Sequence, residues 1–208
     1  SSCTKRSAAD MTLLLVALAA TAALQQHDTL PLRHQRDRNV LSLNHGRLQA
    51  LEINPAFAYV GGQRFILGGT ADAEQHIFVV ADSRRAIQRL YWIQIEERLP
   101  DRPGTYTYDA DSVLIAQGFE LRANVRAYTT TPTGGSDRAR AFALLHARGY
   151  TVPDGATRAR LIYLPEPNAR REVMVIYIEP PASVPNAGDS SASLIERAIA
   201  GLTLRSNR

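Results

Sequence analysis

The chain has 208 residues, of which 45% are apolar, 21% are charged and 7% are aromatic. These proportions are ordinary for a globular domain and argue against intrinsic disorder outside the chain ends. The formal net charge is only +4 and the basic residues are interleaved with acidic ones, so no nucleic-acid-binding surface is expected.

The chain begins with the pattern of a secretory signal peptide, which we predict over residues 1–23. Lys5 and Arg6 precede the apolar run MTLLLVALAATAAL, which ends in small residues of the A-x-A type. This run has 14 residues, fewer than the roughly 20 that cross a bilayer as a helix. We therefore expect no stable transmembrane span after cleavage. The alternative is an N-terminal helix packed on the domain.

Cleavage would leave a chain without cysteine, because the one cysteine, Cys3, lies inside the predicted signal segment. Disulfides and thiol chemistry are then not expected. All but one of the 24 basic residues are arginine, which is typical of a GC-rich bacterial genome. The sequence thus predicts a periplasmic or secreted bacterial protein.

The next segments predict a polar linker followed by strands. Residues 24–46 lack sustained periodicity, apart from a short strand expected near Val40 to Leu43. Three short apolar segments follow and are separated by Asn54-Pro55 and Gly61-Gly62; they are RLQALEI, FAYV and RFILGG. Longer strands over 74–81 and 86–97 flank the loop DSRR and predict a β-hairpin.

The second half predicts strands and two helices. Alternating apolar residues predict a strand over 118–130. A helix is expected after an N-cap at Ser136, ending at Gly149. The strands RARLIYL and REVMVIYIE come next, and the second is so uniformly apolar that we expect it at the centre of the sheet. The last helix is predicted to start at the capping box formed by Ser193 and Glu196.

This order predicts an α+β fold over residues 47–205, forming a single domain after the signal segment. We expect a mainly antiparallel sheet of about six to eight strands, packed by the two helices of the C-terminal half.

Three motif-like segments have simple structural interpretations. The GGTAD segment at Gly68 lacks the lysine and the following helix of a phosphate-binding loop, so it predicts a turn between strands. Asp109 and Asp111 form a D-x-D pair in a loop, where aspartate is common for turn and capping reasons. Ser136 in GGSDR lacks the complete G-x-S-x-G pattern of a nucleophile elbow, and His146 at the far end of the helix is out of its reach.

Asp72, Glu74 and His76 form the first candidate site, because alternate residues of a strand share one face. Two carboxylates and an imidazole are able to hold a divalent cation or to act as an acid–base pair. Phe78 and Val80 continue the same face into an apolar environment, so the alternative is a solvated strand end beside the core. No metal and no cofactor is assigned.

The second candidate site is a set of aromatic and arginine side chains on neighbouring strands, which would line a pocket on one sheet face and take an apolar or anionic ligand. Its members are Trp92, Tyr91, Tyr106, Tyr108, Tyr128, Arg122 and Arg126. The alternative is ordinary core and surface packing.

These observations favour an exported, non-catalytic domain that binds a small molecule or a protein partner. Two other functions remain open. One is a cofactor-independent or cation-assisted enzyme that uses Asp72, Glu74 and His76. The other is an accessory subunit of a protein complex that docks through its exposed sheet face.

Overall fold

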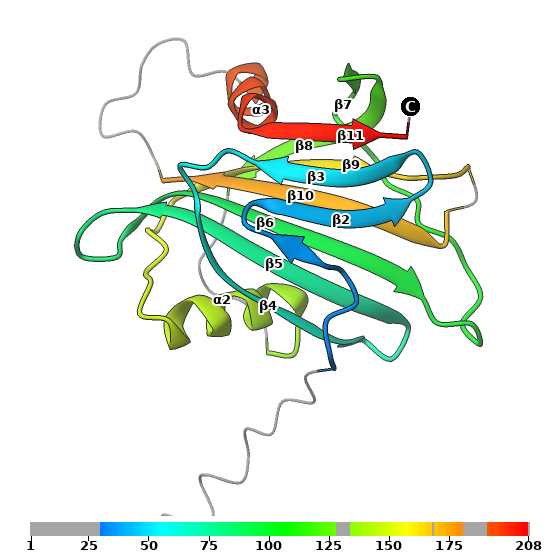
Figure 1. Cartoon of the computed structure of the whole chain (residues 1–208), viewed down its shortest axis with the longest axis horizontal. Coiled ribbons are helices and arrows are strands. Elements are labelled where there is room, and N and C mark those ends of the chain that lie inside the picture. The colour runs from blue at the N-terminus through cyan, green and yellow to red at the C-terminus, as the bar shows by residue number, and fades with distance from the viewer. Residues whose placement is uncertain (1–29, 128–133, 168, 181–190, 208) are drawn as a thin grey trace, which may run out of the picture.

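The computed structural model describes residues 30–127, 134–167, 169–180 and 191–207. These residues form two antiparallel sheets and two helices, stacked in three layers (Figure 1). A seven-stranded sheet lies in the middle, helix α2 covers one side, and a four-stranded sheet with helix α3 covers the other. We call these two sides of the large sheet the α2 side and the small-sheet side.

The elements are as follows. The large sheet has the order β4 (Ala58–Leu67), β5 (Ala71–Ala81), β6 (Ile87–Arg98), β10 (Arg171–Glu179), β9 (Thr157–Tyr163), β8 (Phe119–Ala127) and β7 (Ser112–Ala116). The small sheet has the order β1 (Arg36–Asp37), β2 (Val40–His45), β3 (Leu48–Ile53) and β11 (Leu202–Ser206). The helices are α2 (Asp137–Ala147) and α3 (Ser191–Ala200). No helix of the described chain has the length and apolarity needed to cross a membrane.

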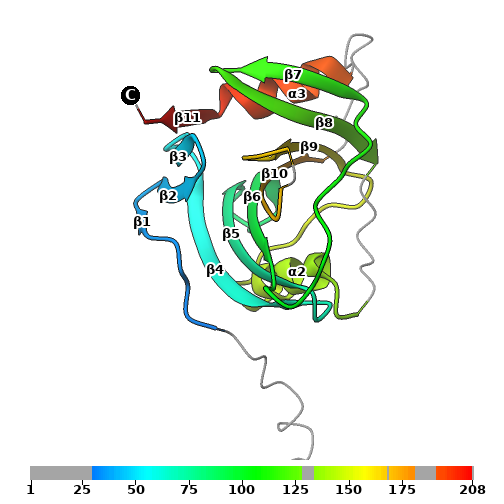
Figure 2. The same ribbon diagram turned by 90° about the vertical axis from the view of Figure 1, so that its right-hand side faces the viewer.

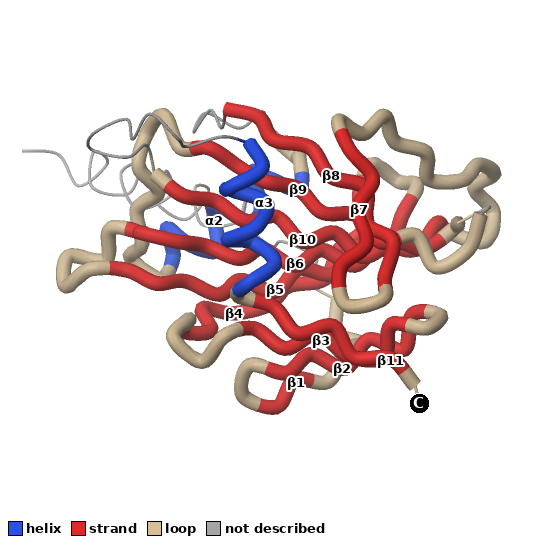
Figure 3. The backbone as a smooth tube through the Cα atoms, turned by 90° about the horizontal axis from the view of Figure 1, so that it is seen from above, coloured by secondary structure: helices blue, strands red, loops and turns tan. Residues whose placement is uncertain are grey.

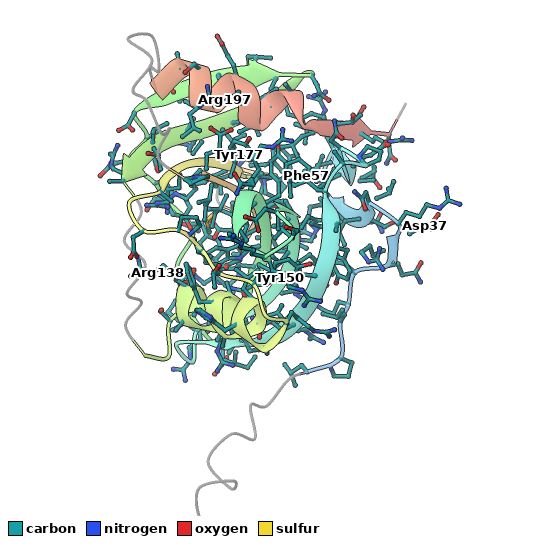
Figure 4. All side chains as sticks on the ribbon, turned by 90° about the vertical axis from the view of Figure 1, so that its left-hand side faces the viewer. Asp37, Phe57, Arg138, Tyr150, Tyr177 and Arg197 are labelled. Carbon is teal, nitrogen blue, oxygen red and sulfur yellow. The ribbon has the colours of Figure 1, made fainter. Side chains whose placement is uncertain are left out.

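Two hydrophobic cores result because the large sheet is buried on both sides. On the small-sheet side, the small sheet and α3 pack on the aromatic residues Phe57, Phe78, Tyr91 and Tyr177. Seen from above, α3 crosses the large sheet beside the small one (Figure 3), and Phe57 and Tyr177 lie between the layers (Figure 4). On the α2 side, Phe142 and Leu145 of the helix pack on apolar residues of β5, β6 and β10.

The structure confirms the expected α+β class with a mainly antiparallel sheet. The Ser136 hydroxyl accepts a hydrogen bond from the Ala139 amide at 3.1 Å and so caps α2, and Gly149 follows with a φ of +76°. The strand β10 is the fourth of seven, as its apolar run indicates. The β5–β6 hairpin and the turn at Gly68 also lie where the sequence predicts them.

Several elements differ from the expectation. The large sheet has seven strands, but the separate small sheet was not predicted, and neither were the short strands β7 and β11. The segment 24–46, expected to be a linker, contains β1 of that small sheet, whereas the short strand expected near Val40 to Leu43 is present as β2. The last helix starts at Ser191, two residues before the expected cap at Ser193. The predicted signal peptide and Tyr128 lie outside the described residues.

The Gly61-Gly62 pair lies inside a continuous β4, although the sequence predicts a turn there. The register with β5 shifts between Tyr59 and Gly61, which marks a β-bulge. A Cβ atom at Gly62 would lie only 2.7 Å from the Tyr59 hydroxyl and 3.0 Å from Nδ1 of His76. Glycine at this position therefore makes room for a polar contact of the core, rather than for a turn.

Gly62→Ala is expected to lower the free energy of unfolding by about 1–3 kcal/mol, because the added methyl group displaces Tyr59 or His76. Chemical denaturation of the variant measures this loss. Gly134→Ala is the matched control, since no atom lies within 4 Å of a Cβ built there. Equal stabilities of the two variants would contradict the steric argument.

Candidate functional site

The α2 side of the large sheet changes from apolar to cationic across its strands. One row of cross-strand neighbours runs from Ile77 through Trp92, Ile176 and Arg160 to Asn124. The apolar half of this row belongs to the core under α2. The other half is polar and consists of Arg160 of β9 and Asn124 of β8.

A pocket of about 360 Å³ lies where this row meets the N-terminus of α2. Trp92, Met174 and Ile176 form its apolar wall, and all three are almost completely buried. Its cationic wall consists of Arg138, Arg158 and Arg160; Arg138 lies at the start of α2 (Figure 4). We call this space the α2 pocket. Its volume lies in the range of small-molecule sites.

Hydrogen bonds to Asp137 fix the helix N-terminus beside this pocket. Its side-chain Oδ2 accepts a hydrogen bond from Gln94 at 3.1 Å, and its backbone carbonyl accepts one from Gln75 at 3.0 Å. Gln75 and Gln94 are fully buried and also bond to each other at 2.8 Å. The start of α2 is therefore held against β5 and β6. The positive end of the helix dipole adds to the cationic character of the α2 pocket.

Two buried carboxyl groups lie next to the pocket. Glu96 of β6 and Glu172 of β10 stand directly opposite each other, with exposed fractions of 5% and 0%. Glu96 accepts hydrogen bonds from the Tyr106 hydroxyl at 3.1 Å and from Gln94. Tyr108 interacts with Glu172, but neither carboxyl oxygen of Glu172 has a hydrogen-bond partner of normal geometry among the described residues. We call Glu96 and Glu172 the carboxyl pair.

Burial raises the pKa of both carboxyl groups, and the charge of Glu96 raises that of Glu172 further. The pKa of Glu172 rises to about 8, mainly through burial and secondarily through Glu96. Burial likewise raises the pKa of Glu96. Two carboxylates this close do not ionise together at low cost, so the pair retains a proton near neutral pH.

Arginine and tyrosine side chains stack above the carboxyl pair. The guanidinium carbon of Arg98 lies 4.8 Å from the ring centre of Tyr106, and that of Arg160 lies 5.2 Å from the ring centre of Tyr108. The two tyrosine rings are parallel within 3°. The loop 99–111 is thereby held over this end of the sheet, and Arg160 connects it to the α2 pocket.

Two further pockets, of about 450 and 230 Å³, meet at Arg122. The larger contains Arg47 and Arg122 together with Glu120 and Glu166, so its formal charges cancel. The smaller one is bounded by the loop from Tyr106 to Asp109. Neither concentrates charge of one sign. The α2 pocket joins three arginines to a wall of three buried apolar side chains, so we take it as the candidate ligand site.

The three residues of the first candidate site lie together on the small-sheet side, but inside a closed network. Asp72 accepts two hydrogen bonds from Arg64, at 2.9 and 2.6 Å. Glu74, fully buried, accepts backbone hydrogen bonds from Arg33 at 2.6 Å and from His34 at 3.1 Å. His76 donates to Glu74 through Nε2 at 2.8 Å. The segment before β1 is thus fastened across the edge of β4 and β5.

The remaining contacts of His76 and Glu74 are also within the protein. The Tyr59 hydroxyl lies 3.1 Å from Nδ1 of His76 and donates to it when Nε2 carries the proton. Burial alone would raise the pKa of Glu74, but the hydrogen bonds from His34, His76 and Arg33 outweigh it and hold this pKa well below its usual range. This set, with Glu74 at its centre, is the Glu74 network.

The seven residues of the predicted ligand pocket do not stay together. Trp92, Tyr106, Tyr108, Arg122 and Arg126 belong to the α2 side, but they spread over three separate places. Tyr91 points to the opposite side, where its hydroxyl donates to the Ala198 carbonyl at 2.7 Å and anchors α3. Arg126 is exposed and pairs with Asp111 at 2.5 Å. Tyr91 and Arg126 are therefore outside the candidate site.

The sequence interpretation missed Arg138, Arg158, Arg160 and Glu172. A signal for two of them was available, since Arg158 and Arg160 stand two apart in a strand and must share a face. Glu172 precedes an apolar run, and nothing local indicates that it faces Glu96. Ser136 acts as the α2 cap, as the sequence predicts, and Asp111 pairs with Arg126 of β8.

The described residues include no group of three or more histidine, cysteine, aspartate or glutamate side chains arranged to hold a metal ion. Comparison of the chain with protein-family models, with curated proteins and with solved structures finds no match.

Proposed function

We propose that this protein is an exported, non-catalytic binding domain whose ligand is an amphipathic anion held in the α2 pocket. The observation that carries the proposal is the composition of that pocket, with an indole, a thioether and an aliphatic chain on one wall and three guanidinium groups, against the single carboxylate of Asp137, on the other. An apolar body would lie on Trp92 and Met174, and a phosphate, sulfate or carboxylate group would face the arginines.

The charge pattern around the pocket supports an anionic ligand. Three arginines and one aspartate, Asp137, line the pocket, so its lining carries three positive formal charges against one negative charge. An oxyanion is the complementary ligand, because guanidinium groups bind oxyanions through short, charge-assisted hydrogen bonds.

Buried polar atoms without a partner also lie at the pocket. Nε1 of Trp92 and Nε of Arg160 are buried, and neither has a hydrogen-bond acceptor among the described residues. Both are donors, so an anion or its bound water is the complementary partner. Such groups are uncommon in folded proteins unless a ligand or water satisfies them.

The binding function is preferred over the enzymatic alternative because of how the Glu74 network is built. The side chains of Asp72, Glu74 and His76 form hydrogen bonds with other groups of the protein, and Glu74 and His76 are inaccessible to solvent. A general acid or base must reach the proton it transfers. The accessory-subunit function stays open as a prediction.

The single tryptophan provides a direct test, because Trp92 is part of the α2 pocket. We expect octyl phosphate, below its micelle concentration, to change Trp92 fluorescence saturably and to raise the melting temperature. Inorganic phosphate should act more weakly, and neutral octyl glucoside should have no saturable effect. Arg160→Gln should weaken octyl phosphate binding by roughly 10-fold or more, the loss of one charge-assisted hydrogen bond.

Arg84→Gln is the matched control, since Arg84 is an exposed arginine of the β5–β6 turn, outside the α2 pocket. Its removal lowers the net charge equally but should leave binding unchanged. Absence of a saturable signal with octyl phosphate, or equal weakening by the two variants, would refute the proposal.

A further inference from the structure

The described part of the chain has four sheet edges, and three of them are protected against pairing with another strand. On β4, the Leu30 amide donates to the Arg64 carbonyl at 2.8 Å, and the following segment covers the edge. The edge strand β1 has only two residues, both exposed and charged. Short, charged or covered edges are the usual devices that prevent association.

The edge of β11 is protected by one side chain. Gln117, in the turn between β7 and β8, donates from Nε2 to the Leu202 carbonyl at 2.9 Å. Its Oε1 accepts a hydrogen bond from the Leu204 amide at 2.8 Å. The amide group thus takes the place of a peptide unit of a neighbouring strand. It also fixes the β7–β8 hairpin to the small sheet.

The fourth edge, β7, has none of these devices. Its sequence is SVLIA, without charge or proline, and no other strand of the described chain pairs with it beyond β8. Val113 and Ile115 are 57% and 71% exposed, the two most exposed large hydrophobic residues in the described chain. Figure 2 shows β7 as the outermost strand at the top of the molecule.

We propose that β7 is a homodimerisation edge, on which a second copy of this chain adds its own β7 in antiparallel orientation. The pairing has a two-fold axis at Leu114. Leu114 then faces its own copy, Val113 of each chain faces the other copy's Ile115, and the two large sheets join into one. This interface is independent of the ligand proposed for the α2 pocket.

A second copy fits this edge because the interface is self-complementary. In a two-fold interface every residue near the axis meets itself or a close neighbour, so a charged residue there would meet its like. The five residues of β7 are uncharged. The antiparallel arrangement also joins the exposed Val113 and Ile115 of both chains into a single apolar patch, and the outward N–H and C=O groups of each strand find partners.

The dimer is expected to be weak. Stable interfaces bury more than about 1,000 Å² in total, and an edge of five residues falls at the low end of that scale. We therefore expect a concentration-dependent equilibrium between monomer and dimer. In sedimentation velocity, the full chain should move from the mass of one chain towards that of two between low and several hundred micromolar.

Ile115→Lys should remain monomeric throughout this range, because the lysine places like charges near the axis. Ile66→Lys is the matched control, since Ile66 is also an exposed isoleucine on an edge strand, at 41%, but on β4. It should dimerise as the unaltered chain does. The proposal would be overturned if the unaltered chain stayed monomeric over the whole concentration range. It would also be overturned if the Ile115→Lys variant still dimerised.

A disulfide tests the register. In a Cys3→Ser background, Leu114→Cys places one thiol opposite its own copy, at the Cα separation of about 4.5–5.5 Å that a disulfide spans. Mild oxidation should yield a covalent dimer. Ile66→Cys in the same background should not. A dimer that forms in solution without the Leu114→Cys cross-link would place the interface elsewhere and refute the β7 pairing.

Discussion

Glu74→Gln is expected to destabilise the protein by about 3–5 kcal/mol, the usual cost of removing one member of a buried charged network. Glu74 is fully buried and accepts hydrogen bonds from the amides of Arg33 and His34 and from His76. Glutamine has nearly the same shape as glutamate, but its NH₂ group would face hydrogen-bond donors that now bind a carboxylate oxygen. At least one buried donor then loses its acceptor.

The loss should depend on pH, which separates the charge of Glu74 from its shape. The folded-state pKa of Glu74 lies below the ordinary value of 4.5. The stabilisation by its carboxylate is therefore complete above about pH 5.5 and disappears as the pH falls towards the folded-state pKa. Urea denaturation should show a constant difference between the two proteins near neutral pH and a shrinking difference in acid.

Glu97→Gln is the control for Glu74→Gln. Glu97 pairs with Arg33 at 3.0 Å, but its side chain is 46% exposed, so its loss should cost less than about 1 kcal/mol. A Glu74→Gln variant as stable as this control would contradict the structural role of the network. A difference that stays unchanged in acid would contradict the ionised state assigned to Glu74.

The sequence predicts the elements whose cause is local. Alternation identifies β8, the uniformly apolar run places β10 at the centre of the sheet, and Ser136 with Gly149 marks the ends of α2. Asp72, Glu74 and His76 were correctly expected on one face, because that follows from the period of a strand. The small sheet escaped prediction because its strands are short, and β11 comes from the far end of the chain.

The chemistry of the sites depends on contacts between distant residues, which leave no local pattern. The sequence indicates a catalytic role for the Glu74 carboxylate, but this carboxylate accepts a hydrogen bond from the amide of Arg33, 41 residues away. Gly62 looks like part of a turn until His76 is seen against it. Glu96 and Glu172 become a pair only through the register between β6 and β10. The spacing of residues along a strand predicts which face of the sheet a side chain lies on, but it does not predict which residues of other strands contact that side chain.

Glu172→Gln is expected to stabilise the protein at alkaline pH, by about 2–5 kcal/mol, an effect opposite in sign to that of Glu74→Gln. The folded-state pKa of Glu172 is about 8, against an ordinary value of 4.5. The unfolded chain therefore releases this proton at lower pH than the folded one. The unaltered protein loses stability as the pH rises from about 4.5 to about 8, and glutamine removes that loss.

Urea denaturation at about pH 5 and about pH 9 measures this effect. The gain from Glu172→Gln should be large at the higher pH and small at the lower one, where the wild-type carboxyl group is already protonated. Glu120→Gln is the control, because Glu120 is an exposed carboxylate on the same side of the large sheet. Its stability change should be small and nearly equal at both pH values.

The opposite result would also bear on the α2 pocket. If Glu172→Gln destabilised the protein equally at both pH values, Glu172 would be ionised and paired with Arg98 or Arg160, the two arginines that act on it. Arg160 would then be neutralised from the interior, and the α2 pocket would lose part of the charge on which anion binding depends. If Glu172 is protonated, it does not neutralise Arg160, and the positive charge of Arg160 is available to bind the ligand. The pH dependence of Glu172→Gln therefore tests both the state of the carboxyl pair and a premise of the proposed function.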